Sequence, residues 1–247
     1  MSEWLERALL PDWPVPLRVR ALMTTRLGGV SKGSYCGLNL GDHVGDVPAD
    51  VAANRALVSA ELPGEPVWLS QVHGITVIDA DREAGTIPRA DASVAFLPHL
   101  VCAVLTADCL PVLFARMDGK AVGVAHAGWR GLSGGVLETT VKRLGPADQL
   151  VAWLGPAIGP TAFEVGDEVR DAFIAKDSLA SNAFLPGVER GKWWADIYLL
   201  AKQRLAAIGV TQVYGGGLCT VGDADRFFSY RRDRSTGRMA ALIWLEA

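Results

Sequence analysis

The sequence is poor in the two residue types that most often bind transition metals. Its 247 residues include only four histidines and four cysteines. The cysteines lie far apart, at Cys36, Cys102, Cys109 and Cys219, a distribution typical of reduced thiols rather than of a disulfide framework. The chain also has no Cys-x-x-Cys pair, which excludes the commonest type of structural zinc motif.

Long apolar runs and a basic face are missing as well. The longest apolar stretch, Val101–Phe114, is interrupted by Asp108 and Pro111 and is too short to span a bilayer. The first residues, Met1–Arg7, carry acids and lack the apolar core of a signal peptide. Lys and Arg are spread along a chain of net charge −3. We therefore expect a cytoplasmic protein that binds neither nucleic acid nor a membrane.

Short apolar, β-branched runs predict more strands than helices. The predicted strands are Leu17–Thr25, Val67–Ser70, Ile75–Asp79, Asp91–Phe96, Val101–Thr106, Pro111–Ala115, Ala121–Ala125, Gln149–Leu154, Val210–Tyr214 and Met239–Leu245. The predicted helices are Pro48–Leu62, Gly131–Leu144, Gly166–Ala175 and Trp193–Ile208. This pattern indicates an α+β fold with packed mixed β-sheets flanked by helices. Because no Ser/Pro-rich linker is present, we expect residues 1–247 to form a single domain.

Two histidines and one cysteine lie in runs that packing alone does not explain. His73 interrupts two apolar strands, Cys109 follows Asp108 between two apolar runs, and His126 precedes a Gly-Trp-Arg-Gly turn into a helix. Two histidines and a cysteine form a metal-ligand set that leaves one coordination position open, and they also contain a thiol-imidazole pair. Their wide separation along the chain favours a catalytic site assembled by tertiary structure over a structural zinc.

Charged residues near these runs are candidates for substrate binding. Arg26 and Arg130 lie beside glycines, where a guanidinium can bind phosphate or carboxylate, although either could be an ordinary surface arginine. Asp108 is a charge within an apolar stretch, so its burial requires a compensating partner. The glycine-rich segment Leu27–Asp46 predicts a long loop of a kind that is usually functional or mobile. His43 in this loop fits either a site or plain turn chemistry.

Several runs, in order along nearly the whole chain, together resemble the YfiH family, also called the laccase-domain or polyphenol oxidase family. The matching runs are Thr24–Gly29, Asn39–Asp46, Gln71–Gly74, Ala107–Val112, His126–Gly131, Gly155–Pro160 and Phe228–Asp233. The resemblance implies a fold similar to a cysteine-hydrolase-like fold of a deamidating toxin. It also implies a zinc site, with copper as the other metal, whose ligands and catalytic residues match His73, Cys109 and His126.

The resemblance further implies phosphorolysis of purine nucleosides such as adenosine, inosine and methylthioadenosine, with adenosine deaminase activity. The partners would then be a small nucleoside and phosphate, and the sequence sets no oligomeric state. Residues that match the family runs, or that lie beside the implied ligands, become candidates for substrate binding. They are Arg26, Asn39, Gln71, Asp108 and Arg130.

Other functions stay open beside this one. The family is also associated with editing of peptidoglycan precursors, in which a hydrolase removes L-Ser from UDP-MurNAc-L-Ser, and with copper-linked polyphenol oxidation. Four histidines cannot supply both a blue-copper centre and a trinuclear cluster, which excludes a conventional laccase. Cys109 with His126 as base would give a metal-free nucleophile. A zinc-stabilised binding protein is the non-enzyme alternative.

Overall fold

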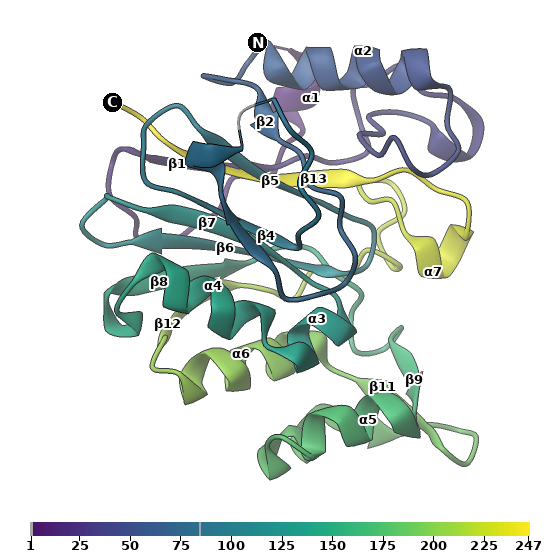
Figure 1. Cartoon of the computed structure of the whole chain (residues 1–247). Coiled ribbons are helices and arrows are strands. Elements are labelled where there is room, and N and C mark those ends of the chain that lie inside the picture. Colours follow the sequence, from purple (N-terminus) through teal and green to yellow (C-terminus); the bar gives the residue numbers. More distant parts are fainter. Residues whose placement is uncertain (1, 84) are drawn as a thin grey trace.

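Two sheets packed face to face, with helices on both outer sides, form the body of the protein (Figure 1). The computed structural model describes residues 2–83 and 85–247. In the smaller sheet β2 runs parallel to β5, and the other neighbouring strands are antiparallel. Its strand order is β1 (Val19–Met23), β13 (Met239–Leu245), β5 (Val101–Thr106) and β2 (Pro66–Val67).

The larger sheet has six strands and is also mixed. Its outer pairs β12–β8 and β3–β4 are parallel, and the pairs between them are antiparallel. The strand order is β12 (Gln212–Gly215), β8 (Leu150–Leu154), β6 (Leu110–Arg116), β7 (Val122–Ala127), β4 (Ala92–Ala95) and β3 (Val77–Asp79). The prediction of an α+β fold with packed mixed sheets is confirmed.

Alternation along β13 shows how the layers are joined. Met239, Ala241 and Ile243 pack between the two sheets, while Ala240 and Leu242 face the opposite side. Because successive side chains of a strand point to opposite faces, a strand buried on both faces needs apolar residues throughout. All seven residues of β13 are indeed buried.

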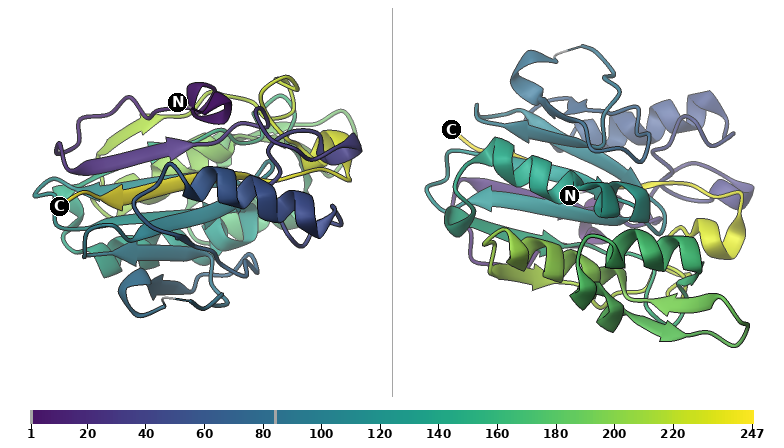
Figure 2. Two further views of the ribbon diagram at one scale, coloured as in Figure 1. Left: turned by 90° about the horizontal axis from the view of Figure 1, so that it is seen from above. Right: turned by 60° about the horizontal axis from the view of Figure 1, so that its bottom comes forward.

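Helices cover the outer face of each sheet. Over the smaller sheet, Trp4 of α1 (Glu3–Glu6) and Val58 of α2 (Pro48–Ser59) join its outer core, and Figure 2 shows α2 in the view from above. Over the larger sheet lie α4 (Val136–Leu144) and α6 (Ile197–Ala207). None of the helices in the described ranges is long and apolar enough to cross a membrane.

Smaller elements lie at one end of this sandwich. A three-stranded sheet that the sequence did not predict lies beside α5 (Figure 1). Its order is β10 (Phe184–Pro186), β11 (Lys192–Ala195) and β9 (Glu164–Gly166), and α5 is Asp167–Ile174. The short helix α7 spans Tyr230–Asp233. Short 3-10 turns occur at Gly33–Tyr35, Ala80–Arg82, Ala147–Gln149 and Ser178–Ala183.

Two predicted helices are wrong in their extent. The segment Trp193–Ile208 begins as strand β11, and its helix starts only at Ile197, where the Asp196 carboxylate accepts the N–H of Leu199. The bulky Trp193 and Trp194 pair with strands on both sides instead. The segment Gly131–Leu144 is two helices, α3 (Trp129–Gly134) and α4, separated by Gly135.

Because Gly135 breaks the helix, replacing it with alanine is predicted to destabilise the protein, whereas the same change inside a helix usually stabilises it. Gly135 has φ +110°, so Gly135→Ala should lower the free energy of unfolding by about 1–2 kcal/mol. In a continuous helix the same change would instead stabilise by about 1 kcal/mol. Urea denaturation of the two proteins measures the difference. Gly222→Ala is the control, because its φ lies outside the left-handed region and an added Cβ meets nothing closer than 3.7 Å.

Candidate functional site

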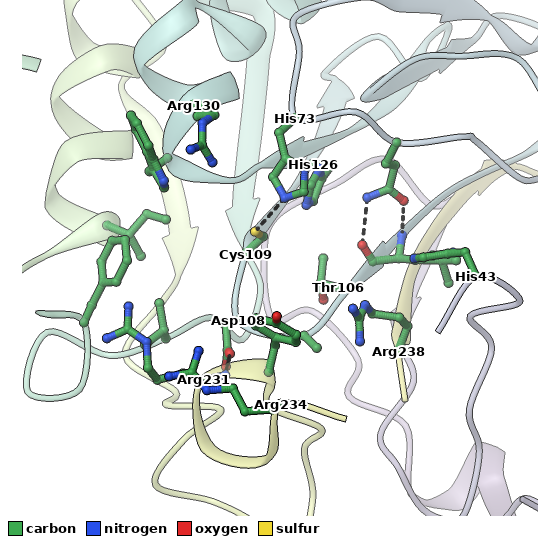
Figure 3. A pocket seen from close by; sticks show the side chains of 18 residues that line it. His43, His73, Thr106, Asp108, Cys109, His126, Arg130, Arg231, Arg234 and Arg238 are labelled. Atoms are coloured by element: carbon green, nitrogen blue, oxygen red, sulfur yellow. Dashed lines mark hydrogen bonds between the residues drawn. The ribbon is translucent and has the colours of Figure 1, made fainter. Parts of the chain in front are cut away.

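The structure brings His73, Cys109 and His126 together from three separate elements (Figure 3). His73 lies in the loop between β2 and β3, Cys109 lies in the turn between β5 and β6, and His126 lies within β7. One ligand atom from each of the three lies within 4.8 Å of the others. His73 is exposed, Cys109 half-buried and His126 buried, so the cluster opens to solvent on one side.

The spacing of these atoms fits a metal ion. Sγ of Cys109 lies 3.8 Å from Nε2 of His73. Zinc–sulfur and zinc–nitrogen bonds at a tetrahedral angle would place these two atoms about 3.6 Å apart. A Cβ atom at Gly128 would lie 2.8 Å from Sγ of Cys109 and 2.9 Å from the His73 ring, so glycine is needed there. The cluster could therefore hold a metal through one sulfur and two nitrogens.

The carboxylate of Asp91 fixes the loop that carries His73. It accepts the backbone N–H groups of His73 at 2.8 Å, of Gly74 at 2.7 Å and of Val72 at 3.2 Å. His73 has φ +58°, a conformation that is uncommon for a residue with a side chain. Three amides bound to one buried carboxylate offset the cost of that conformation.

The same carboxylate orients His126. Oδ1 of Asp91 lies 2.9 Å from Nδ1 of His126, and both side chains are buried. With Nδ1 occupied in this way, Nε2 is the nitrogen left for a metal. Burial raises the pKa of Asp91, but hydrogen bonds from His126, Gly74 and Val72 outweigh it, so its pKa lies below the ordinary value. Asp91 is therefore ionised, and it binds both the loop that carries His73 and the ring of His126.

Cys109 and His126 also shift each other's pKa in the metal-free protein. Burial raises the pKa of Cys109, yet the charge of His126 and hydrogen bonds from both histidines lower it to about 6. Burial lowers the pKa of His126, but the Cys109 thiolate and Asp91 raise it to about 9. A thiolate beside an imidazolium is a reactive nucleophile, and a thiolate is also the form that binds metals.

Asp108 shapes the turn that presents Cys109. Its φ is +91°, and its carboxylate accepts Oγ1–H of Thr220 and the N–H of Arg231, both at 2.6 Å. These two neutral donors are the hydrogen-bond partners that offset the cost of burying the Asp108 carboxylate. Asp108 therefore ties the β5–β6 turn to Thr220 and to the first turn of α7.

A cavity of about 510 Å³ adjoins the cluster. Among the described residues, its wall contains apolar and aromatic side chains together with four arginines and a single carboxylate, Asp108. In Figure 3, Arg130 lies above Cys109, and Arg231, Arg234 and Arg238 lie below it. The polar, charged and aromatic lining residues outside the cluster are His43, Gln71, Thr106, Asp108, Trp129, Arg130, Phe163, Tyr230, Arg231, Arg234 and Arg238.

Three of the five predicted substrate-binding residues line this cavity. Arg130 does so with its guanidinium 4.5 Å from the ring of Trp129. Asp108 also lines the cavity, with its carboxylate bonded to Thr220 and Arg231. Gln71 also lines it, but its amide is bound to the backbone of Leu105, donating at 2.8 Å and accepting at 2.7 Å. Gln71 therefore joins its loop to the end of β5 rather than presenting a free amide.

The other two predicted residues lie elsewhere. Arg26 is not among the residues that line the cavity, because its guanidinium is bound to the carbonyl of Ala224 and lies over the ring of Phe228. Asn39 is fully buried, and its Oδ1 accepts the N–H of Arg238 at 2.8 Å. Asn39 positions Arg238 from behind, so the structure gives it a role in holding the cavity wall.

Sequence reasoning missed Asp91, Thr106 and the arginines Arg231, Arg234 and Arg238. Asp91 does carry a signal, since it is an acid at the start of an otherwise apolar run. The arginines belong to a basic stretch near the end of the chain, which by composition resembles any exposed segment. Only the tertiary structure places them opposite the cluster.

The dual role of Asp91 leads to a prediction about metal binding. Asp91→Asn removes the charge that orients His126 and should weaken metal binding, tested with Zn²⁺ as the probe, about 10- to 100-fold. Competition with a chromophoric chelator measures the dissociation constant. Asp79→Asn is the matched control, because Asp79 pairs with Arg143 and does not line the cavity. Equal zinc affinity in all three proteins would contradict the role assigned to Asp91.

Comparison with known proteins identifies the family of this chain. Residues 20–246 match the family model described as multi-copper polyphenol oxidoreductase laccase. A Pseudomonas aeruginosa protein named purine nucleoside phosphorylase is 55% identical over 247 residues, which cover 100% of both chains. The Escherichia coli protein named purine nucleoside phosphorylase YfiH is 53% identical and covers 98% of this chain and 100% of its own. These names indicate an enzyme.

Solved structures show the same fold. A Neisseria meningitidis protein superposes with a TM-score of 0.94 at 51% identity, covering 98% of this chain and 100% of its own. YlmD from Geobacillus stearothermophilus gives a TM-score of 0.81 at 32% identity, with 94% and 93% coverage. Fold and sequence agree, and the chain belongs to the YfiH family of laccase-domain proteins.

Proposed function

We propose that this protein is a zinc-dependent purine nucleoside phosphorylase. The observation that carries the proposal is the opening of the His73–Cys109–His126 cluster onto a cavity that also holds aromatic side chains and four arginines. Phosphorolysis needs a surface for a flat base, a site for an anion and an electrophilic group. Relatives more than half identical carry the name of this activity.

Each part of the reaction has suitable residues in the cavity. A phosphate oxygen forms a bond to C1′ of the ribose while the C1′–N9 bond breaks, and the purine leaves with the electron pair and takes up a proton. Trp129, Phe163 and Tyr230 supply aromatic surface for the purine. The arginines supply donors for phosphate. Bound Zn²⁺ would supply a Lewis acid and lower the pKa of water.

The ligand set favours zinc over copper in this role. One thiolate and two imidazoles, with the fourth coordination position open, match the ligand number and ligand types of catalytic zinc sites. A blue-copper centre adds a weak axial ligand, commonly Met, and no methionine is among the residues that line the cavity in the described part of the chain. His43 lines the cavity and His99 does not, so too few imidazoles are at hand for a trinuclear copper cluster.

Adenosine deamination fits the same cavity, with water in place of phosphate as the attacking group. Water adds at C6 of the purine, and ammonia leaves after proton transfer. We propose this as a side activity of the zinc site, because lowering the pKa of water is one of the effects of a catalytic zinc.

One observation favours a second candidate, removal of L-Ser from UDP-MurNAc-L-Ser. The four arginines against one acid provide more positive charge than a single phosphate needs, and a diphosphate would use it. Amide hydrolysis also suits an activated water. A turnover screen separates the two candidates. Inosine and adenosine, each with and without phosphate, are incubated beside UDP-MurNAc-L-Ser, and products are identified by mass spectrometry.

Phosphate-dependent release of hypoxanthine from inosine is the result that we expect from this screen. Release of serine without any phosphate-dependent product would overturn the phosphorylase proposal in favour of the hydrolase. Polyphenol oxidation is tested in the same way, by oxygen uptake with a catechol.

Metal removal yields a further prediction. A chelator should reduce phosphorolysis more than 10-fold, and about one equivalent of Zn²⁺ should restore it, while the protein stays folded because its core does not depend on one ion. Activity assays and thermal melts are recorded on the same samples. Activity that survives complete zinc loss would favour Cys109 as nucleophile, and unfolding on zinc loss would favour a structural metal.

Paired histidine variants act as controls for this experiment. His73→Ala should lose both zinc and activity. His99→Ala should retain both, although His99 also has a positive φ, +66° against +58° at His73. The pair therefore separates loss of a ligand from loss of a strained histidine.

A further inference from the structure

The arginines of the cavity lack acidic partners. No carboxylate of the described residues lies within ion-pair distance of Arg130, Arg231, Arg234 or Arg238. Asp108, the single acid of the wall, already accepts hydrogen bonds from Thr220 and from the backbone of Arg231. Charges gathered without counterions repel one another, so this wall is stabilised when an anion binds.

Arg238 is held with one edge of its guanidinium occupied and the other edge unused. Its Nη1 donates to the carbonyls of Thr236 and Gly237, both at 3.0 Å, while Nε and Nη2 make no hydrogen bond to the described residues. The backbone of Arg238 is fixed by Asn39 and by Leu40, whose N–H donates to its carbonyl at 3.1 Å. Arg238 is thus a braced, half-buried cation with free donors.

Arg234 lies at the centre of a strained turn. Its φ and ψ are +60° and −62°, and the N–H of Ser235 donates to the carbonyl of Asp233 at 2.7 Å. These values define a γ-turn with positive φ, a rare and strained conformation. The Arg234 guanidinium carbon lies 5.9 Å from the centre of the Tyr230 ring, and no described residue accepts a hydrogen bond from the guanidinium. Strain of this kind persists where the surroundings enforce it, often at binding sites.

The glycine-rich loop Leu27–Asp46 contacts this turn and helps to fix its conformation. The hydroxyl of Tyr35 bonds to the carbonyl of Val44 at 2.7 Å and lies 3.0 Å from Oγ of Ser235, the residue that follows Arg234. Asn39 in the same loop holds Arg238. Both arginines are therefore positioned from one loop segment.

Thr106 supplies an unused polar atom in the same wall. It is the last residue of β5, pairs with Met239 beside Arg238, and is only 1% exposed. Its Oγ1 is buried and has no hydrogen-bond partner among the described residues. A buried hydroxyl without a partner costs about 1–3 kcal/mol, which a ligand oxygen would recover. In Figure 3, Thr106 and Arg238 lie on the same side of the cavity, below Cys109.

We propose that Thr106, Arg234 and Arg238 form a subsite for a phosphate group, separate from the metal-ligand cluster and from Arg130. The free edge of Arg238 suits bidentate binding of two phosphate oxygens, Arg234 neutralises the second charge, and the Thr106 hydroxyl donates to a third oxygen. The proposal deepens the proposed phosphorolysis, in which the group would be inorganic phosphate. A phosphate ester of a larger substrate has the same chemistry.

Binding measurements on the full-length, zinc-loaded protein test the subsite. Isothermal titration calorimetry is carried out with inorganic phosphate, and separately with UMP and UDP as phosphate esters. We expect Arg238→Gln and Arg234→Gln each to weaken binding about 10-fold or more, and Thr106→Val to weaken it about 3-fold or more. Arg238→Lys keeps the charge and should recover part of the loss. Arg82→Gln, at a residue that does not line the cavity, should change nothing.

Zinc content and melting temperature are recorded for every variant, and Arg234 is exposed, so its substitution does not endanger folding. Weaker binding of inorganic phosphate in the arginine variants supports the subsite with free phosphate as its ligand. If wild-type protein binds only the esters, and the same variants weaken them, the subsite stands and the phosphorolysis proposal falls. If all variants bind both classes of anion like wild type, or no anion binds, the subsite is overturned, and the turnover screen still decides on phosphorolysis independently.

Discussion

A single buried carboxylate, Asp91, positions two of the three side chains of the candidate metal cluster. Its oxygens receive three backbone amides from the loop of His73 and the Nδ1 position of His126, so two ligands from different elements are set by one group. Burying a charge is costly unless it is fully bonded, and here the bonds also serve the geometry of the cluster. A carboxylate bonded to a histidine is the usual outer partner of a metal-binding imidazole.

The sandwich delivers the remaining parts of the site to the same place. β5 belongs to the smaller sheet and β6 to the larger, so the short turn between them crosses from one sheet to the other at the edge of the core. That turn contains Asp108 and Cys109 and follows Thr106, while β7 beside β6 carries His126. Polar groups collected where the inter-sheet core ends meet both water and a low dielectric, which strengthens their interactions with a ligand.

The sequence predicted most of the fold because β-branched runs and alternation are local signals. It failed where tertiary pairing decides, as at Trp193 and Trp194, which read as the start of a helix but pair in a sheet. His73, Cys109 and His126 could be found since their runs lacked a packing explanation. Arg26 and Asn39 do not line the cavity, and their glycine-rich surroundings in the sequence say nothing about side-chain direction: Arg26 bonds to Ala224, and Asn39 is buried behind Arg238. The arginine wall depends on contacts between ends of the chain that no local pattern encodes.

Charge explains why these parts belong to one site. The Cys109 thiolate and Asp108 are the negative groups next to the cavity, and burial lowers the pKa of Arg238 although both of them attract its charge. A divalent metal at the cluster would leave the cavity still more positive, so the wall is suited to substrates that bring negative charge with them. The guanidinium of Arg234 and the buried hydroxyl of Thr106 point the same way, since neither makes a hydrogen bond to the described residues. The fold thus keeps a cationic wall without acidic partners beside a metal-ligand cluster. Binding of an anionic ligand would offset both the repulsion between the arginines and the cost of the unpartnered Thr106 hydroxyl.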